Sequence, residues 1–213
     1  MANILIIDDH PLMLSSIKQL VEMQFPAATI TTASTASVAD RELANTDRDW
    51  QLVLADLSIP EDNKDPARSE TGLALLRKIM KLYPDLNLMV YSSNLKVLVQ
   101  LKHQIDNHRG GFTIADKTAE PTEVRRRMQY AIEGITLTKE IRKGLELKPE
   151  WLSTLQFADR GLPDKAISEQ LNVTERAVRH YWTKVQDVLE IDRDNLNLRI
   201  LTLNRAREVG LID

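Results

Sequence analysis

Short apolar runs alternate five times with longer segments of helical periodicity over the first 134 residues, and this pattern limits the fold strongly. The runs contain mainly aliphatic and β-branched residues, as expected for strands that are covered on both faces. They lie at residues 4–7, 29–33, 52–55, 86–91 and 112–115. Apolar residues recur at helical spacing in residues 11–24, 36–46, 72–82, 94–106 and 121–134. This alternation predicts an α/β domain with a doubly wound parallel five-stranded sheet and helices on both of its faces.

A second, smaller domain is expected after residue 134. Residues 135–147 are polar and lysine-bearing, which is typical of a linker. No strand-like run occurs from residue 148 onward, and helices are predicted at residues 149–159, 164–171, 174–190 and 197–209. We therefore expect an α/β domain at 1–134, a linker at 135–147 and a small all-α domain at 148–213. A chain of 213 residues is long enough for two such domains.

Composition narrows the cellular setting. The chain contains no cysteine, which excludes disulfides and thiolate metal sites and suits a reducing compartment. No apolar run approaches the roughly 20 residues of a membrane span, and no basic region precedes the first apolar run as in a signal peptide. We expect a soluble, cytoplasmic protein without a membrane partner. The net charge of −3 does not by itself indicate a polyanionic ligand.

Three aspartates follow two of the apolar runs. Asp8 and Asp9 come directly after residues 4–7, and Asp56 comes directly after residues 52–55. Functional groups of a parallel sheet gather beyond the carboxyl ends of its strands, so the three carboxylates converge if these two strands are neighbours. Such a cluster suits Mg²⁺, beside which one carboxylate can attack a phosphoryl group. An ordinary loop start and a Mg²⁺-dependent phosphohydrolase are the alternatives for this pattern.

Four segments occur in an order that is found in a known family. Residues 4–12 carry the paired aspartates, residues 52–60 carry Asp56, Tyr91-Ser92 ends the fourth run, and Gly111-Phe112 opens the fifth. Together they resemble the receiver domains of two-component response regulators of the NarL/FixJ type. The resemblance covers residues 1–134 and implies a flavodoxin-like fold.

The resemblance also implies a role for each matching residue. Asp56 would accept a phosphoryl group from a sensor histidine kinase. Ser92 would then hydrogen-bond to a phosphoryl oxygen while Phe112 repacks, so that a change of charge drives a packing switch. The implied Mg²⁺ ligands are Asp9 and Asp56 directly, Asp8 through water, and Ser58 through its backbone carbonyl.

The chain departs from the receiver pattern in two places. The lysine that ends the fifth strand in the family would stand at Ala115, whereas the chain has its lysine at Lys117. Lys117 is therefore the candidate to supply a charge-assisted bond to the phosphoryl group, and a solvated lysine is the alternative. The polar loop at residues 61–71 is also longer than in the family, and its Lys64 and Arg68 are further candidate cations.

The second domain contains a predicted helix-turn-helix. The helices predicted at 164–171 and 174–190 are joined by a turn at Asn172-Val173, and Thr174 suits an N-cap. The second helix has one apolar face, and its other face can enter a DNA major groove. The candidate DNA-binding residues are Thr174, Arg176, Arg179, His180, Thr183 and Lys184.

Residues 148–212 resemble the LuxR-type DNA-binding output domain. Together the two resemblances imply a phosphorylation-controlled transcription factor rather than an enzyme, binding double-stranded DNA as a homodimer. Residues 145–213, however, carry ten Lys and Arg against twelve Asp and Glu, a net charge of −2. Nucleic-acid modules are usually basic, so one copy should bind DNA weakly and two copies should gain affinity together. The alternative is a helical module for protein interaction or dimerisation without operator binding.

Overall fold

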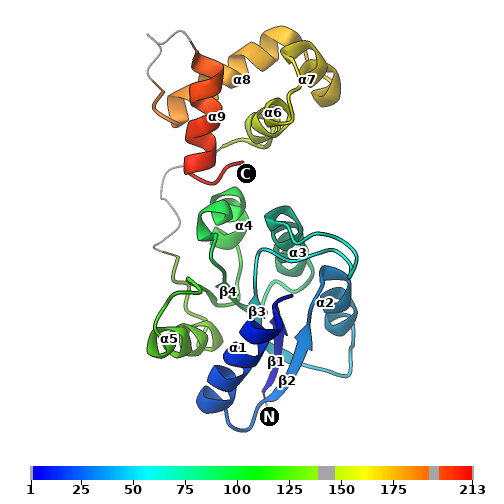
Figure 1. Ribbon diagram of the computed structural model, residues 1–213, viewed down its shortest axis with the longest axis vertical. Helices are drawn as coiled ribbons and strands as arrows, with labels where there is room; N and C mark the ends of the chain where they lie inside the picture. Colours follow the sequence, from blue (N-terminus) through cyan, green and yellow to red (C-terminus); the bar gives the residue numbers. More distant parts are fainter. Residues whose placement is uncertain (1, 139–146, 192–196, 213) are drawn as a thin grey trace. The chain divides into compact units, whose positions relative to one another are not determined.

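Figure 1 shows the computed structural model, which describes residues 2–138, 147–191 and 197–212. Contacts divide the chain into two units, one of residues 1–95 and 103–140 and the other of residues 96–102 and 141–213. The linker predicted at 135–147 lies mostly outside the described residues, and its boundaries stay a prediction.

The first unit contains a five-stranded sheet whose order is β2-β1-β3-β4-β5, with every neighbouring pair parallel. The strands are β1 (Asn3–Ile7), β2 (Thr29–Ala33), β3 (Trp50–Ala55), β4 (Asn87–Tyr91) and β5 (Phe112–Ala115). β1 and β3 are direct neighbours, with Ile7 opposite Ala55. The doubly wound parallel sheet predicted from the sequence is thus confirmed, and its order places the ends of β1 and β3 side by side.

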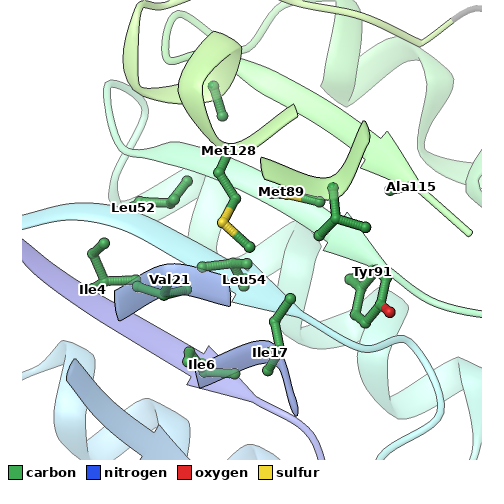
Figure 2. Close-up of a cluster of buried hydrophobic side chains, with 12 residues drawn as sticks. Ile4, Ile6, Ile17, Val21, Leu52, Leu54, Met89, Tyr91, Ala115 and Met128 are labelled. Atoms are coloured by element: carbon green, nitrogen blue, oxygen red, sulfur yellow. The ribbon is translucent and has the colours of Figure 1, made fainter. Parts of the chain in front are cut away.

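Helices cover both faces of this sheet (Figure 1). They are α1 (Pro11–Gln24), α2 (Ala36–Leu43), α3 (Ser69–Leu82), α4 (Lys102–Asp106) and α5 (Pro121–Ile132). Side chains on successive strand residues point to opposite faces, so Ile4 and Ile6 share the face that α1 and α5 cover. Figure 2 shows this core, in which Ile17 of α1 and Met128 of α5 lie over the strands.

The segment predicted as one helix at 94–106 is split. Leu95–Leu101 forms a 3₁₀ helix, η1, and only Lys102–Asp106 is α-helical. Val97, Leu98 and Val99 are all buried, whereas an amphipathic α-helix buries a stripe and not three consecutive residues. The two β-branched valines also have low helix propensity. The helix predicted at 36–46 is shorter than expected too, since it ends at Leu43.

The part of the second unit that follows residue 146 is mainly helical where the structure describes it. Its helices are α6 (Pro149–Asp159), α7 (Asp164–Leu171), α8 (Glu175–Val188) and α9 (Leu198–Glu208). Asn172 ends α7 in the left-handed conformation, with φ of 53°, and Thr174 caps α8 by accepting a hydrogen bond from the Ala177 amide. These two devices set the turn between α7 and α8. None of the described helices is long and apolar enough to cross a lipid bilayer.

Candidate functional site

Carboxylates from the ends of β1 and β3 meet in one small cluster. Asp8 and Asp56 are buried, with 3% and 4% of their surface exposed. One ligand atom from each of Asp8, Asp9, His10 and Asp56 lies within 4.8 Å of all the others. The backbone amide of Asp56 donates to the carbonyl of Ile7 at 2.8 Å, which fixes the two strand ends together. The structure thus brings together the three aspartates that the sequence placed at strand ends.

Local hydrogen bonds orient the two buried carboxylates. Asp8 Oδ1 accepts from the amide of His10 at 2.8 Å, and Asp56 Oδ1 accepts from the amide of Ser58 at 3.2 Å. Each aspartate therefore has one oxygen held by the turn that follows its strand. The other oxygen of each carboxylate, Oδ2, faces a shared cation.

That cation is Lys117. Its Nζ lies 2.6 Å from Asp8 Oδ2 and 2.7 Å from Asp56 Oδ2, and only 12% of its side chain is exposed. Burial lowers the pKa of Lys117, but hydrogen bonds and charges from Asp56 and Asp8 outweigh it and leave the pKa above the usual value. The ammonium is therefore charged at neutral pH. The other candidate cations, Lys64 and Arg68, lie on the exposed 61–71 loop.

The donor chemistry of the cluster fits a divalent cation. Three carboxylates supply the oxygen ligands that hard cations prefer. Asp9 Oδ1 is buried and has no hydrogen-bond partner among the residues that the structure describes, although His10 Nδ1 lies 2.8 Å away. An unpaired buried carboxylate oxygen is costly unless a cation approaches it. The cluster can therefore hold a divalent ion, with Lys117 balancing part of its charge in the ion's absence.

A cavity of about 420 Å³ opens beside Asp56. It is lined by His10, Met13, Asp56, Ser58, Ser69, Ser92, Ser93, Asn94 and Lys117. Ser92 is almost fully buried, and its hydroxyl lies 3.5 Å from the amide nitrogen of Asn94. The side-chain amide of Asn94 in turn lies 3.5 Å from the Ser69 hydroxyl. The cavity next to the Asp56 carboxylate is therefore rich in hydroxyl groups, and Lys117 supplies an ammonium.

Phe112 lies apart from this cavity. It is fully buried in β5, and the ring of His108 meets it edge-on with centroids 6.5 Å apart. Its backbone carbonyl accepts a hydrogen bond from the amide of Leu137 at 2.8 Å. The structure thus does not place Phe112 among the residues that line the cavity beside Asp56.

Sequence reasoning missed several residues of the cavity lining, namely Met13, Ser69, Ser93 and Asn94. Ser69 opens α3 at the far end of the 61–71 loop, and Asn94 precedes η1. Neither residue ends an apolar run or belongs to a motif, so the pattern gave no signal for them. They reach the cavity because β3 and β4 are neighbours and the segments after both strands leave from the same edge.

The candidate residues of α8 form one outward face. Thr174, Arg176, Arg179 and His180 are exposed, and Thr183 and Lys184 are partly exposed. The Thr183 hydroxyl donates to the carbonyl of Arg179 at 3.1 Å, so its donor hydrogen is used within the helix. Four cationic or ionisable residues therefore lie on this face, namely Arg176, Arg179, His180 and Lys184.

The opposite face of α8 is held by a polar network around Asp164 of α7. Its Oδ1 accepts from Trp182 Nε1 at 3.1 Å and from an Arg199 guanidinium nitrogen at 2.7 Å. The Arg199 guanidinium also lies over the Trp182 ring, 5.0 Å from its centroid. One carboxylate therefore connects α7, α8 and α9 and fixes the orientation of the exposed face.

An acidic, lysine-containing pocket at the end of a doubly wound parallel sheet, joined to a helix-turn-helix unit, is the architecture of a response regulator. The comparisons with known proteins agree. Over 200 residues the chain is 30% identical to the nitrate/nitrite response regulator protein NarL of Escherichia coli K12, covering 84% of each chain. The chain belongs to this NarL/FixJ family of response regulators, as the sequence motifs indicated. No protein-family model matches it.

Solved structures show the same fold. RcsB of Salmonella typhimurium superposes with a TM-score of 0.61 at 21% identity, covering 97% of this chain and 100% of that chain. A complex of the two-component response regulator RcsB with DNA has a TM-score of 0.60 at 20% identity, with 98% of each chain covered. These relatives are regulators and not enzymes, which agrees with the prediction made for this chain.

Proposed function

We propose that this chain is a transcription factor whose binding to double-stranded DNA is controlled by phosphorylation of Asp56. The observation that carries the proposal is the position of the Lys117 ammonium between two buried carboxylates at the ends of β1 and β3. A buried carboxylate with a cation beside it can accept an anionic group whose charge the site already compensates. Membership of a response-regulator family supports the same role.

The phosphoryl donor would be a sensor histidine kinase. A carboxylate oxygen of Asp56 attacks phosphorus, the phosphorus–nitrogen bond of the phosphohistidine breaks, and the imidazole leaves with the bonding electrons. Lys117 then exchanges part of its bond to Asp56 for a bond to a phosphoryl oxygen. Ser92, whose hydroxyl lines the same cavity, offers a second hydrogen bond.

Mg²⁺ is the ion we assign to the acidic cluster. Asp9 and Asp56 would hold it directly, Asp8 through water, and Ser58 through its backbone carbonyl. When bound, Mg²⁺ neutralises negative charge that builds up on the transferred phosphoryl group. The buried Asp9 Oδ1 supports this assignment, because it accepts no hydrogen bond from the described residues, although His10 Nδ1 lies 2.8 Å away.

The helical unit would bind DNA through α8. Arg176, Arg179, His180, Thr183 and Lys184 lie on its outward face, and Thr174 caps its N-terminus. Such a face fits the major groove, where arginine reads guanine and lysine contacts phosphates. Because the region 145–213 has a net charge of −2, we propose that a homodimer provides the two half-site contacts that useful affinity requires. RcsB, with the same fold, is described in complex with DNA.

Mass spectrometry of the intact chain after incubation with acetyl phosphate and Mg²⁺ tests the acceptor. Wild type should gain one phosphoryl group and Asp56→Asn should gain none. Asp62→Asn, which changes an exposed carboxyl in the 61–71 loop, is the matched control and should behave as wild type. A phosphoryl group on Asp56→Asn would contradict the assignment of the acceptor.

A second experiment tests the output. Beryllofluoride-treated protein is used to select sequences from a random DNA library, and light scattering follows its mass in solution. We expect a two-fold related site and a dimer. The acidic balance of the helical unit favours the alternative of a protein-interaction module, which would be supported by a dimer that enriches no DNA sequence.

A further inference from the structure

The lysine of the acidic pocket comes from an unusual place in the chain. Ala115, the last residue of β5, occupies the position where the sequence pattern expects a lysine, and Lys117 lies in the loop that follows. A strand residue is held by its ladder hydrogen bonds, whereas a loop residue has none and pays more conformational entropy to be fixed. A loop lysine that reaches two buried carboxylates therefore needs another restraint on its backbone.

Tyr91 supplies such a restraint. Its hydroxyl donates to the backbone carbonyl of Lys117 at 3.2 Å, across 26 positions of sequence. Tyr91 is the last residue of β4 and the register partner of Ala115 in β5. Its ring packs in the core between the sheet and the helices α1 and α5, and Figure 2 shows it beside Ala115. A rigid aromatic side chain thus carries a hydroxyl from the core to the lysine loop.

The loop is also fastened from its other end. Asp116 Oδ1 accepts from the backbone amide of Thr118 at 2.8 Å and from its hydroxyl at 2.6 Å. This turn restrains the residues on both sides of Lys117, and Tyr91 restrains Lys117 itself. Burial raises the pKa of Tyr91, partly opposed by the charge of Lys117, so the hydroxyl keeps its proton as a donor.

We propose that Tyr91 is a positioning residue, which holds the backbone of Lys117 so that a lysine from the loop after β5 performs the task usually given to a strand lysine. The inference rests on the proposed function of the pocket, since it concerns how the pocket receives a phosphoryl group. Tyr91 lines a small cavity together with Asp8 and Asp56, but its hydroxyl donates to the Lys117 carbonyl, and in this proposal it acts through that lysine.

The charge of Lys117 gives the proposal a distinctive signature. In the absence of an ion the ammonium pairs with Asp8 and Asp56, so it competes with a divalent cation for the same oxygens. During phosphoryl transfer the Lys117 ammonium favours the reaction, because it stabilises the incoming negative charge. Loosening Lys117 should therefore tighten cation binding and slow phosphorylation. General damage to the fold would weaken both.

The test uses Tyr91→Phe in the full-length chain, which removes the hydroxyl and keeps the ring. Mn²⁺ is the cation probe, measured by the electron paramagnetic resonance signal of the free ion, and acetyl phosphate with saturating Mg²⁺ is the phosphoryl donor. Loss of one neutral hydrogen bond should lower the Mn²⁺ dissociation constant and the phosphorylation rate by about threefold to fivefold each. Lys117→Ala should change both in the same directions by more.

Two further variants decide between a direct and an indirect role. If Tyr91 acts through Lys117, Tyr91→Phe should have no additional effect in a Lys117→Ala background. The double variant A115K/K117A returns a lysine to the strand, and it should recover phosphorylation and become insensitive to Tyr91→Phe. The proposal would be overturned if Tyr91→Phe changed Mn²⁺ binding and the phosphorylation rate by the same factor in every background. It would also be overturned if Tyr91→Phe bound Mn²⁺ more weakly than wild type.

Tyr83 offers a matched control. Its hydroxyl donates to the carbonyl of Leu43 at 3.1 Å, a bond of the same kind that lies outside the residues lining the pocket. Tyr83→Phe should leave Mn²⁺ binding and the phosphorylation rate unchanged. A chain that takes no phosphoryl group in any variant would contradict the proposed function, while the Mn²⁺ measurement would still decide the role of Tyr91.

Discussion

Lys117 Nζ lies 2.7 Å from Asp56 Oδ2 in a pocket where neither side chain is more than 12% exposed. The same ammonium is 2.6 Å from Asp8 Oδ2, so one cation compensates two buried carboxylates. Its removal would leave two like charges close together in a poorly solvated place. The fold of the first unit and the chemistry of its pocket therefore depend on the same side chain.

We expect Lys117→Met to destabilise the first unit by about 2–4 kcal/mol in the presence of a chelator, because breaking a buried ion pair leaves charge uncompensated. Excess Mg²⁺ should restore most of the loss by taking the place of the ammonium. Urea denaturation followed by circular dichroism, with and without Mg²⁺, measures both effects. The exposed Lys64→Met is the control, and equal stability of the two variants in chelator would contradict this account.

The pocket shows which parts of such a site a sequence reveals. Asp8 and Asp56 were predictable because each ends a buried apolar run, and parallel strands bring their carboxyl ends to one edge. The position of Lys117 could only be a candidate, because it depends on hydrogen bonds of a three-residue turn and on Tyr91, which is 26 residues away. Local periodicity carries no information about such a long-range bond.

The same distinction holds for the rest of the fold. The strand at Thr29–Ala33 and the helix at Pro11–Gln24 have the predicted bounds because their patterns are local. η1 was missed because its burial on several sides depends on the tertiary structure around it. The network of Asp164, Trp182 and Arg199 joins residues 35 positions apart and likewise left no local pattern.

His108 should make the stability of the first unit depend on pH. Burial lowers the pKa of His108, partly opposed by its bond to the Leu86 carbonyl and the charge of Asp85. Above about pH 6.5 the imidazole is neutral in both the folded and the unfolded chain. As the pH falls below that value, the unfolded chain takes up a proton that the folded chain resists, so stability is lost until the folded pKa is passed.

Thermal denaturation of wild type and His108→Gln between pH 5.5 and 7.5 measures this effect. As the pH falls, the melting temperature of wild type should drop more steeply than that of His108→Gln. The difference should correspond to at most about one extra proton taken up on unfolding. His103→Gln changes an exposed histidine and should keep the wild-type slope. Parallel curves for wild type and His108→Gln would show that burial of His108 has no such consequence.

The face of α8 gives a prediction about salt. If Arg179 and Lys184 contact DNA, replacing both with alanine should weaken binding. It should also make the slope of log affinity against log salt concentration shallower by about one for each phosphate contact that is lost. Fluorescence anisotropy with a selected DNA duplex at several salt concentrations measures the slope. Arg160→Ala removes an exposed arginine outside α8 and should change neither quantity. A double variant that retains the wild-type slope would favour the protein-interaction alternative.

Gly72 connects the fold of the first unit directly to its pocket. It lies in the first turn of α3, and a Cβ added there would overlap the backbone of Leu57, the residue after Asp56. Since backbone cannot yield as a flexible side chain can, Gly72→Ala should cost about 3 kcal/mol or more and displace the turn that follows β3.

Gly134→Ala is the contrasting control: nothing lies within 4 Å of its added Cβ, and only its φ of 77° is unfavourable, at about 1 kcal/mol. Urea denaturation gives the stability of each variant, and Mn²⁺ binding reports the pocket. A Gly72→Ala chain as stable as Gly134→Ala, with unchanged Mn²⁺ affinity, would mean that α3 can move away from Leu57 without disturbing Asp56.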